Sequence, residues 1–239
     1  MDESVHHTPI EDLPEGRQWD DIIVRRVYAQ VFRTAFDAPG FALLSFRKSI
    51  SSLELRALMW TLKKTLDTLH HQATGKHLVY LSMGRFDSQT TTKFHLDGAP
   101  DEAFLMLGYE GSPVRSELEI ADYSKAAHDW GITPKQLLAD CNPMYADNEK
   151  RLLPYAARLS AFDPAHSHIL LLNNSSLPYS ENGKNLLGVM HQATITPDSQ
   201  ARRIINSTMM ITASSSDSEP VDAAVQQHFL KTSEITGAL

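Results

Sequence analysis

The chain has 239 residues, of which 42% are hydrophobic and 21% charged, and this composition excludes an intrinsically disordered protein. Its 22 Lys and Arg residues against 29 Asp and Glu give a formal charge of −7 with no dense basic patch, so neither nucleic acid nor an anionic membrane is an expected partner. Cys141 is the single cysteine, which excludes an internal disulfide and an all-cysteine zinc site. A metal would therefore need His, Asp or Glu ligands.

Residues 1–17 are polar and predict a loosely held N-terminal arm. They lack the basic start and apolar run of a secretion signal, and no apolar stretch of the chain reaches the roughly 18 residues of a membrane span. We therefore expect a cytoplasmic protein with no membrane partner. Its oligomeric state stays open.

The first third of the chain predicts a helix, a strand and a second helix. Between residues 18 and 36, apolar residues recur at three- and four-residue spacings, and Pro39-Gly40 ends this pattern. The segment 40–46, GFALLSF, is typical of a buried strand. Ser51 or Ser52 can cap a second helix with an apolar face from Leu55 to Leu69.

After His77 the pattern changes to short strands separated by turn residues. The expected strands are residues 77–84, 90–97, 103–110, 117–123, 167–175, 186–196 and 202–213. A partly helical excursion at 124–166 interrupts the series and is expected to cover a substrate entrance. The tail at 214–239 is Ser-rich and then favours a short helix.

These elements predict a mainly β protein with flanking α-helices, folded as a single domain over residues 1–239. The arm at 1–17 precedes a helical support with the first strand at 18–76, and a sandwich or barrel core follows at 77–213, before the tail at 214–239. A doubly wound α/β sheet is disfavoured, because no helix is expected between 77 and 123. No glycine-rich nucleotide loop is present either.

The sequence His95-Leu96-Asp97 supplies two candidate metal ligands. In an extended strand the side chains of residues i and i+2 point to one face, so His95 and Asp97 should converge. Two histidines and one carboxylate form a triad that holds Fe(II) and leaves positions open. His191, on the later apolar strand at 186–196, is the best third ligand, although a structural histidine in the core would explain it too. His166 and His168 are the main rivals.

Arg202 and Arg203 open the next strand, and only one of them can face inward. An inward guanidinium would suit the distal carboxylate of a dicarboxylic cosubstrate. We favour Arg203, since Ser207 would then share its face as a hydroxyl contact. Tyr80, Thr91 and the polar run Asn173-Asn174-Ser175-Ser176 are further candidates to reach cosubstrate or substrate.

The order His95-x-Asp97, His191 and then an Arg at the start of the following strand resembles the Fe(II)/2-oxoglutarate-dependent dioxygenase superfamily. The phytanoyl-CoA hydroxylase-like branch is nearest in outline. The resemblance covers residues 40–213 and implies a double-stranded β-helix, a cupin-like jelly roll. It implies iron bound by His95, Asp97 and His191, with 2-oxoglutarate anchored by Arg203 or Arg202.

The resemblance also implies the reaction. O2 and 2-oxoglutarate would be consumed, succinate and CO2 released, and a small-molecule substrate oxidised. Halogenating relatives lack the carboxylate ligand, so Asp97 favours hydroxylation. Two other hypotheses remain: a cupin-like metal enzyme that does not use 2-oxoglutarate, and a jelly-roll ligand-binding protein without activity. The identity of the prime substrate stays open.

Overall fold

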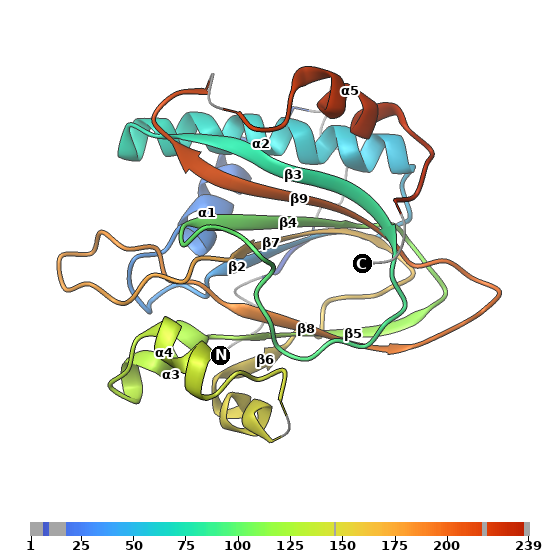
Figure 1. The fold of residues 1–239 in the computed structure, drawn as a ribbon. Helices are drawn as coiled ribbons and strands as arrows, with labels where there is room; N and C mark the ends of the chain where they lie inside the picture. The colour runs from blue at the N-terminus through green and yellow to red at the C-terminus, as the bar shows by residue number, and fades with distance from the viewer. Residues whose placement is uncertain (1–6, 10–17, 146, 217–218, 237–239) are drawn as a thin grey trace.

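The computed structural model describes residues 7–9, 18–145, 147–216 and 219–236, and within them two β-sheets face each other (Figure 1). The large sheet has the strand order β1-β2-β7-β4-β9-β3 and the small sheet the order β6-β5-β8. All neighbouring strands are antiparallel except β1 and β2. In the large sheet the strands are β1 (His7–Pro9), β2 (Phe41–Phe46), β3 (His77–Asp87), β4 (Ala103–Tyr109), β7 (Ser167–Asn173) and β9 (Ile204–Ala213). In the small sheet they are β5 (Arg115–Ala121), β6 (Ala156–Arg158) and β8 (Met190–Thr196). A mainly β fold with flanking helices is confirmed.

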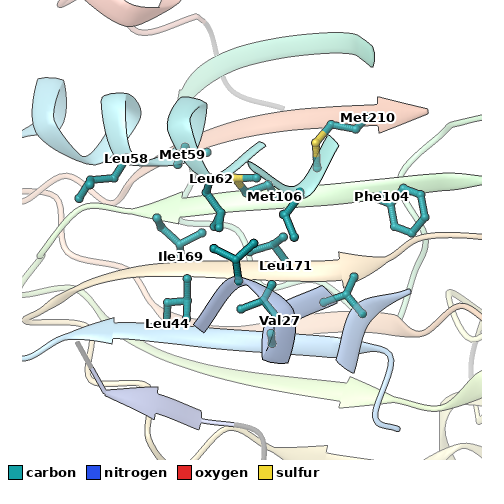
Figure 2. Close-up of a cluster of buried hydrophobic side chains, with 14 of the residues drawn as sticks. Val27, Leu44, Leu58, Met59, Leu62, Phe104, Met106, Ile169, Leu171 and Met210 are labelled. Atoms are coloured by element: carbon teal, nitrogen blue, oxygen red, sulfur yellow. The ribbon is translucent and has the colours of Figure 1, made fainter. Parts of the chain in front are cut away.

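Two helices cover the outer face of the large sheet. The helix α1 (Asp21–Val31) begins at Asp20, whose carboxylate accepts hydrogen bonds from the first turn, and α2 (Ser52–Thr74) begins at Ser51 in the same way. Figure 2 shows how apolar side chains of α1 and α2 meet those of β2, β4, β7 and β9. The short helix α5 (Ala223–Lys231) lies beside α2 and β3.

Strand alternation divides the large sheet into two apolar layers. In β4, Phe104 and Met106 face the helices, whereas Leu105, Leu107 and Tyr109 face the small sheet. We call the apolar side chains between the two sheets the inner layer. It comprises Phe41, Leu43, Ala103, Leu105, Leu107, Tyr109, Val114, Leu118, Ile120, Leu159, Phe162, Leu170, Leu172, Val189, Ala193, Ile195, Ile205 and Met209.

The predicted strand at 90–97 is not a regular strand, although it runs along the free edge of β8. Its backbone pairing to β8 consists of an isolated bridge between His95 and His191 and one hydrogen bond of 2.9 Å from the Thr92 N–H to the Ala193 carbonyl. The hydroxyls of Thr91 and Thr92 instead accept hydrogen bonds from the backbone N–H groups of Ile195 and Ala193, at 2.9 and 3.0 Å. Because these side chains take ladder positions, the segment stays extended without forming a continuous ladder.

The excursion folds into α3 (Tyr123–Asp129), α4 (Pro134–Asp140) and two 3-10 turns (Asn148–Arg151 and Leu153–Tyr155). These elements form a cluster with Phe94, Ala121 and Met190, which we call the excursion cluster; its buried members are Phe94, Ala121, Tyr123, Ala126, Ala127, Leu137, Leu152 and Met190. Since neighbouring residues Ile120 and His191 face inward, the excursion packs on the outer side of the small sheet (Figure 1). It supports this sheet from behind.

Two further expectations concern the chain termini and membranes. Residues 7–9 of the predicted arm form β1 beside β2, while the remainder of 1–17 lies outside the described residues. The predicted tail helix is α5. Within the part of the chain that the structure describes, no helix combines the length and apolar character needed to cross a membrane.

Candidate metal centre

The three predicted metal ligands lie together at one end of the two sheets. One ligand atom each from His95, Asp97 and His191 can be chosen so that all three atoms are within 4.8 Å of one another. Among the described residues, this is the single group of three or more His, Cys, Asp or Glu side chains with such spacing. Two imidazole nitrogens and a carboxylate oxygen are the donor set of mononuclear Fe(II) sites with open positions.

Backbone pairing to β8 positions both histidines. The His95 N–H donates to the His191 carbonyl at 3.1 Å, and the His191 N–H donates to the His95 carbonyl at 3.2 Å. Their ring centroids are consequently 4.3 Å apart. The neighbours Phe94 and Met190 point the other way, into the excursion cluster. Strand alternation thus buries an apolar anchor beside each histidine and turns both imidazoles toward the same space.

Hydrogen bonding selects the nitrogen with which His95 can bind a metal. Its Nδ1 lies 2.7 Å from the Lys93 carbonyl oxygen, which can only accept, so Nδ1 carries the proton. The other nitrogen, Nε2, lies 3.5 Å from Asp97 Oδ1. This is the arrangement in which a second hydrogen bond orients a metal-binding imidazole.

The local electrostatics keep two of the ligands in metal-binding form. Burial, followed by the nearby His95, lowers the pKa of His191 to about 4, so this imidazole is neutral at pH 7. Burial by itself would raise the pKa of Asp97, but the hydrogen bond from His95 and both imidazoles bring it below its usual value. For His95, burial opposes protonation, yet the hydrogen bonds to Asp97 and Lys93 raise its pKa overall. The cluster thus attracts positive charge, and a divalent cation would compete with the proton between His95 and Asp97.

Arg203 lies inside the fold and Arg202 outside it. The Arg203 side chain is 3% exposed, and its Nη1 donates to the Ser88 carbonyl at 2.9 Å. Its Nε and Nη2 are buried without a well-formed hydrogen bond in the described protein, and the neighbouring Tyr109 hydroxyl interacts with the guanidinium. A buried guanidinium with two unpaired donors is costly unless an acceptor joins it, and a carboxylate fits this fork. Arg202 is exposed.

Of the other predicted contacts, Ser207 shares the face of Arg203 and Tyr80 does not. Ser207 is half-buried and four residues beyond Arg203, on the inner side of β9. Thr91 uses its hydroxyl to hold the backbone of Ile195. Tyr80 pairs with Met210 and is buried among side chains under α2, where Lys63 Nζ lies 4.7 Å from its ring centroid. The large sheet therefore separates Tyr80 from Arg203.

The rival histidines have structural partners. Ser45 Oγ lies 2.8 Å from His168 Nδ1, and the Asp163 carbonyl lies 2.7 Å from its Nε2. His166 contacts the Asp163 carboxylate near the surface. Neither belongs to the metal-ligand group.

Sequence reasoning did not identify Tyr109. This side chain is 4% exposed in the inner layer, and the Arg203 guanidinium lies 5.2 Å from its ring centroid. Burial raises the pKa of Tyr109, Arg203 opposes the rise, and the Asp97 carboxylate adds to it. The charges of Arg203 and of the Asp97 carboxylate therefore both act on the Tyr109 hydroxyl. The only signal in the sequence was a polar aromatic residue at a strand end.

Comparisons with known proteins give distant structural likenesses. No family model and no curated protein matches the chain. Three solved structures of the iron and alpha-ketoglutarate-dependent endoperoxidase NvfI are similar to it. A variant has 14% identity over 76% of this chain and 80% of that one, with a TM-score of 0.41. The other two have 15% identity, 77% and 81% coverage and a TM-score of 0.40, and 13% identity, 72% and 78% coverage and a TM-score of 0.35. At this distance the site itself has to carry any functional conclusion.

Proposed function

We propose that this protein is an Fe(II)- and 2-oxoglutarate-dependent oxygenase that hydroxylates a small molecule. One observation carries the proposal: a His-Asp-His donor set and a buried arginine with two unpaired donors belong to the same interior. Arg203 packs against Tyr109 of the inner layer, and His191 faces the inner layer from β8. The charges of Arg203 and Asp97 both act on the Tyr109 hydroxyl.

The order of the strands supports a jelly roll for this interior. From β3 the chain changes sheet at each step except between β5 and β6, passing through the 90–97 segment beside β8, then β4, β5, β6, β7, β8 and β9. Such alternation between two antiparallel sheets is the pattern expected of a jelly roll, whose strands enclose a ligand between the sheets. The candidate metal ligands occupy two neighbouring segments on the small-sheet side.

Each residue has a defined task in this proposal. His95 Nε2, the Asp97 carboxylate and the His191 imidazole would hold iron on one face and leave its other positions free. Arg203 would hold the distal carboxylate of 2-oxoglutarate through Nε and Nη2, with the Ser207 hydroxyl on the same face. When bound, iron and 2-oxoglutarate supply oxidation of a C–H bond by O2, with succinate and CO2 as coproducts. The apolar inner layer would keep water from this chemistry.

The buried Arg203 also favours this function over a metal enzyme without 2-oxoglutarate. Arg56 is also buried with an unpaired Nη1, but it lies beside Phe229 of α5, on the helix side of the large sheet. Arg203 differs because it lies beside Tyr109 of the inner layer, where its partly unpaired guanidinium raises the free energy of the ligand-free fold. A dicarboxylate gives the residue a purpose, because one end can bind the metal while the other reaches the arginine.

Spectroscopy under anaerobic conditions tests the proposal. Addition of Fe(II) and 2-oxoglutarate to the protein should produce a metal-to-ligand charge-transfer band that Asp97→Ala and Arg203→Ala weaken or remove. The exposed Arg202→Ala variant is the matched control and should retain it. After admission of O2, succinate should form and a suitable substrate should gain one oxygen by mass. If the wild-type protein shows no band and Asp97→Ala behaves identically, the proposal is wrong.

A further inference from the structure

The three candidate ligands are attached to the fold in different ways. His191 belongs to β8, and His95 pairs with it through two backbone hydrogen bonds. Asp97 lies beyond this pairing, just before the turn that starts at Gly98, and belongs to no strand. Some other contact must hold its carboxylate near the histidines.

Asn174 makes that contact. The Asp97 N–H donates to Asn174 Oδ1 at 3.1 Å, and Asn174 Nδ2 donates to the Asp97 carbonyl at 2.9 Å. In the described part of the chain, both backbone hydrogen bonds of Asp97 go to this one side chain. The amide imitates a neighbouring strand, because it offers an acceptor and a donor to the two backbone groups of a single residue.

We infer that Asn174 is a positioning residue, which sets the place of the Asp97 carboxylate for metal binding. The inference rests on the proposed function. Asn174 follows directly after β7, in the large sheet, whereas both histidines belong to the small-sheet side. The amide therefore ties the Asp97 backbone to the opposite sheet and so sets the position from which its carboxylate reaches the imidazoles.

The attachment of Asn174 is itself rigid. Its side chain is 4% exposed, and its N–H donates to the Ala103 carbonyl at 2.9 Å. The next residue, Ser175, accepts a hydrogen bond of 2.6 Å on its carbonyl from the Tyr123 hydroxyl. A methyl group on Gly188 would lie 2.0 Å from that carbonyl oxygen. The segment before β8 can therefore pass this close to Ser175 only with glycine at position 188. Contacts with Ala103, Tyr123 and Gly188 thus fix the position of Asn174 and Ser175, so the Asn174 amide can fix the position of Asp97.

This assignment gives a function to one member of the polar run at 173–176. Asn173 has a separate task, since its Nδ2 donates to the Val31 carbonyl of α1 at 2.9 Å. Asn174 is directed at the ligand segment 77 residues earlier in the chain. Groups that orient metal ligands typically contribute about 10- to 100-fold to metal affinity.

Metal titration tests the inference without any need for turnover. Co(II) affinity should be measured for the full chain by its visible absorption and by calorimetry. Asn174→Ala should weaken Co(II) binding at least about 10-fold. Asn174→Ser, which leaves a hydroxyl to help hydrate the turn, is the second variant if the alanine protein folds poorly, and a similar loss is expected from it.

The matched control is Asn206→Ala. Asn206 is also fully buried and donates to the Gly108 carbonyl, but it lies on the helix-facing side of β9. This variant should lose stability to urea without losing Co(II) affinity. A general weakening of the fold would instead affect both variants alike.

A double-mutant cycle with Asp97 separates positioning from other effects. If Asn174 acts through the carboxylate, Asn174→Ala should change Co(II) affinity less than about 2-fold in an Asp97→Ala background. An equal effect in both backgrounds, or unchanged affinity in the single variant, would overturn the inference and leave the proposed function intact. Absence of Co(II) binding by the wild-type protein would overturn the proposed function as well.

Discussion

Replacement of Arg203 by Met should make the ligand-free protein more stable and abolish its response to 2-oxoglutarate. The side chain is 3% exposed, and two of its donors, Nε and Nη2, make no well-formed hydrogen bond in the described protein. Methionine has a similar length and carries no donors. The substitution therefore removes the unsatisfied groups while largely filling the same space.

The expected size follows from the contacts of Arg203. Each unpaired buried donor costs about 1–3 kcal/mol, so removal of Nε and Nη2 should recover about 2–6 kcal/mol. The hydrogen bond to Ser88 and the contact with the Tyr109 ring would be lost, at about 1–3 and 0.5–2 kcal/mol. The central values leave a net gain of about 1 kcal/mol for Arg203→Met. In the wild type, 2-oxoglutarate at 100 times its Kd should add about 2.7 kcal/mol.

Urea denaturation in the presence of Co(II), with and without 2-oxoglutarate, measures both effects. The order of stability should reverse on addition of 2-oxoglutarate, since only the wild type gains from it. Arg202→Met, at the exposed neighbouring position, should behave as the wild type in both conditions. A ligand-free Arg203→Met protein that is more than about 3 kcal/mol less stable than the wild type, or one that 2-oxoglutarate still stabilises, would refute the reasoning.

Three other predictions address separate parts of the molecule. Tyr109→Phe keeps the ring beside Arg203 but removes the hydroxyl, so the Kd for 2-oxoglutarate should rise about 5- to 10-fold with little change in the urea midpoint; an unchanged Kd would show that the hydroxyl takes no part. Phe94→Ala leaves a cavity in the excursion cluster and should lower the unfolding free energy by about 3–5 kcal/mol. It should also weaken Co(II) binding, because Phe94 anchors the neighbouring His95. Normal Co(II) affinity in the destabilised protein would contradict the anchoring role. Burial lowers the pKa of His70 to about 4, so the unfolded chain takes up its proton first as the pH falls below about 6.5. Stability should therefore decline by about 2 kcal/mol between pH 7 and pH 4.5, a decline that His70→Phe should reduce measurably in urea titrations at both pH values.

The regular elements were predictable because their signals are local. The three- and four-residue spacing before Phe36 predicted α1, and the serine pair at 51 and 52 predicted the start of α2, where Ser51 is the cap. The short apolar runs predicted most strands to within a few residues. The short strands β1 and β6 were not predicted. The segment at 90–97 was predicted as a strand but is not one, since the hydroxyls of Thr91 and Thr92 accept bonds from β8 that strand carbonyls would accept.

The candidate site was predictable where it depends on side-chain chemistry and on strand alternation. The i, i+2 spacing brings His95 and Asp97 to one face, and the same rule sends Phe94 to the other. The rule does not determine which of the two faces of a strand points into the fold. A shift of one residue at the start of β9 would exchange Arg202 with Arg203, and only packing against Tyr109 and Ser88 decides between them.

By itself, the sequence determined the mainly β architecture with its flanking helices, the acidic charge and a metal donor set limited to His, Asp and Glu. The tertiary structure alone decided that Arg203 and not Arg202 is buried, that Tyr80 faces the helices, and that Asn174 holds Asp97. The physical reason is range. Periodicity and caps act within a few residues, whereas the contact between Asn174 and Asp97 spans 77 positions and exists only once the two sheets have packed.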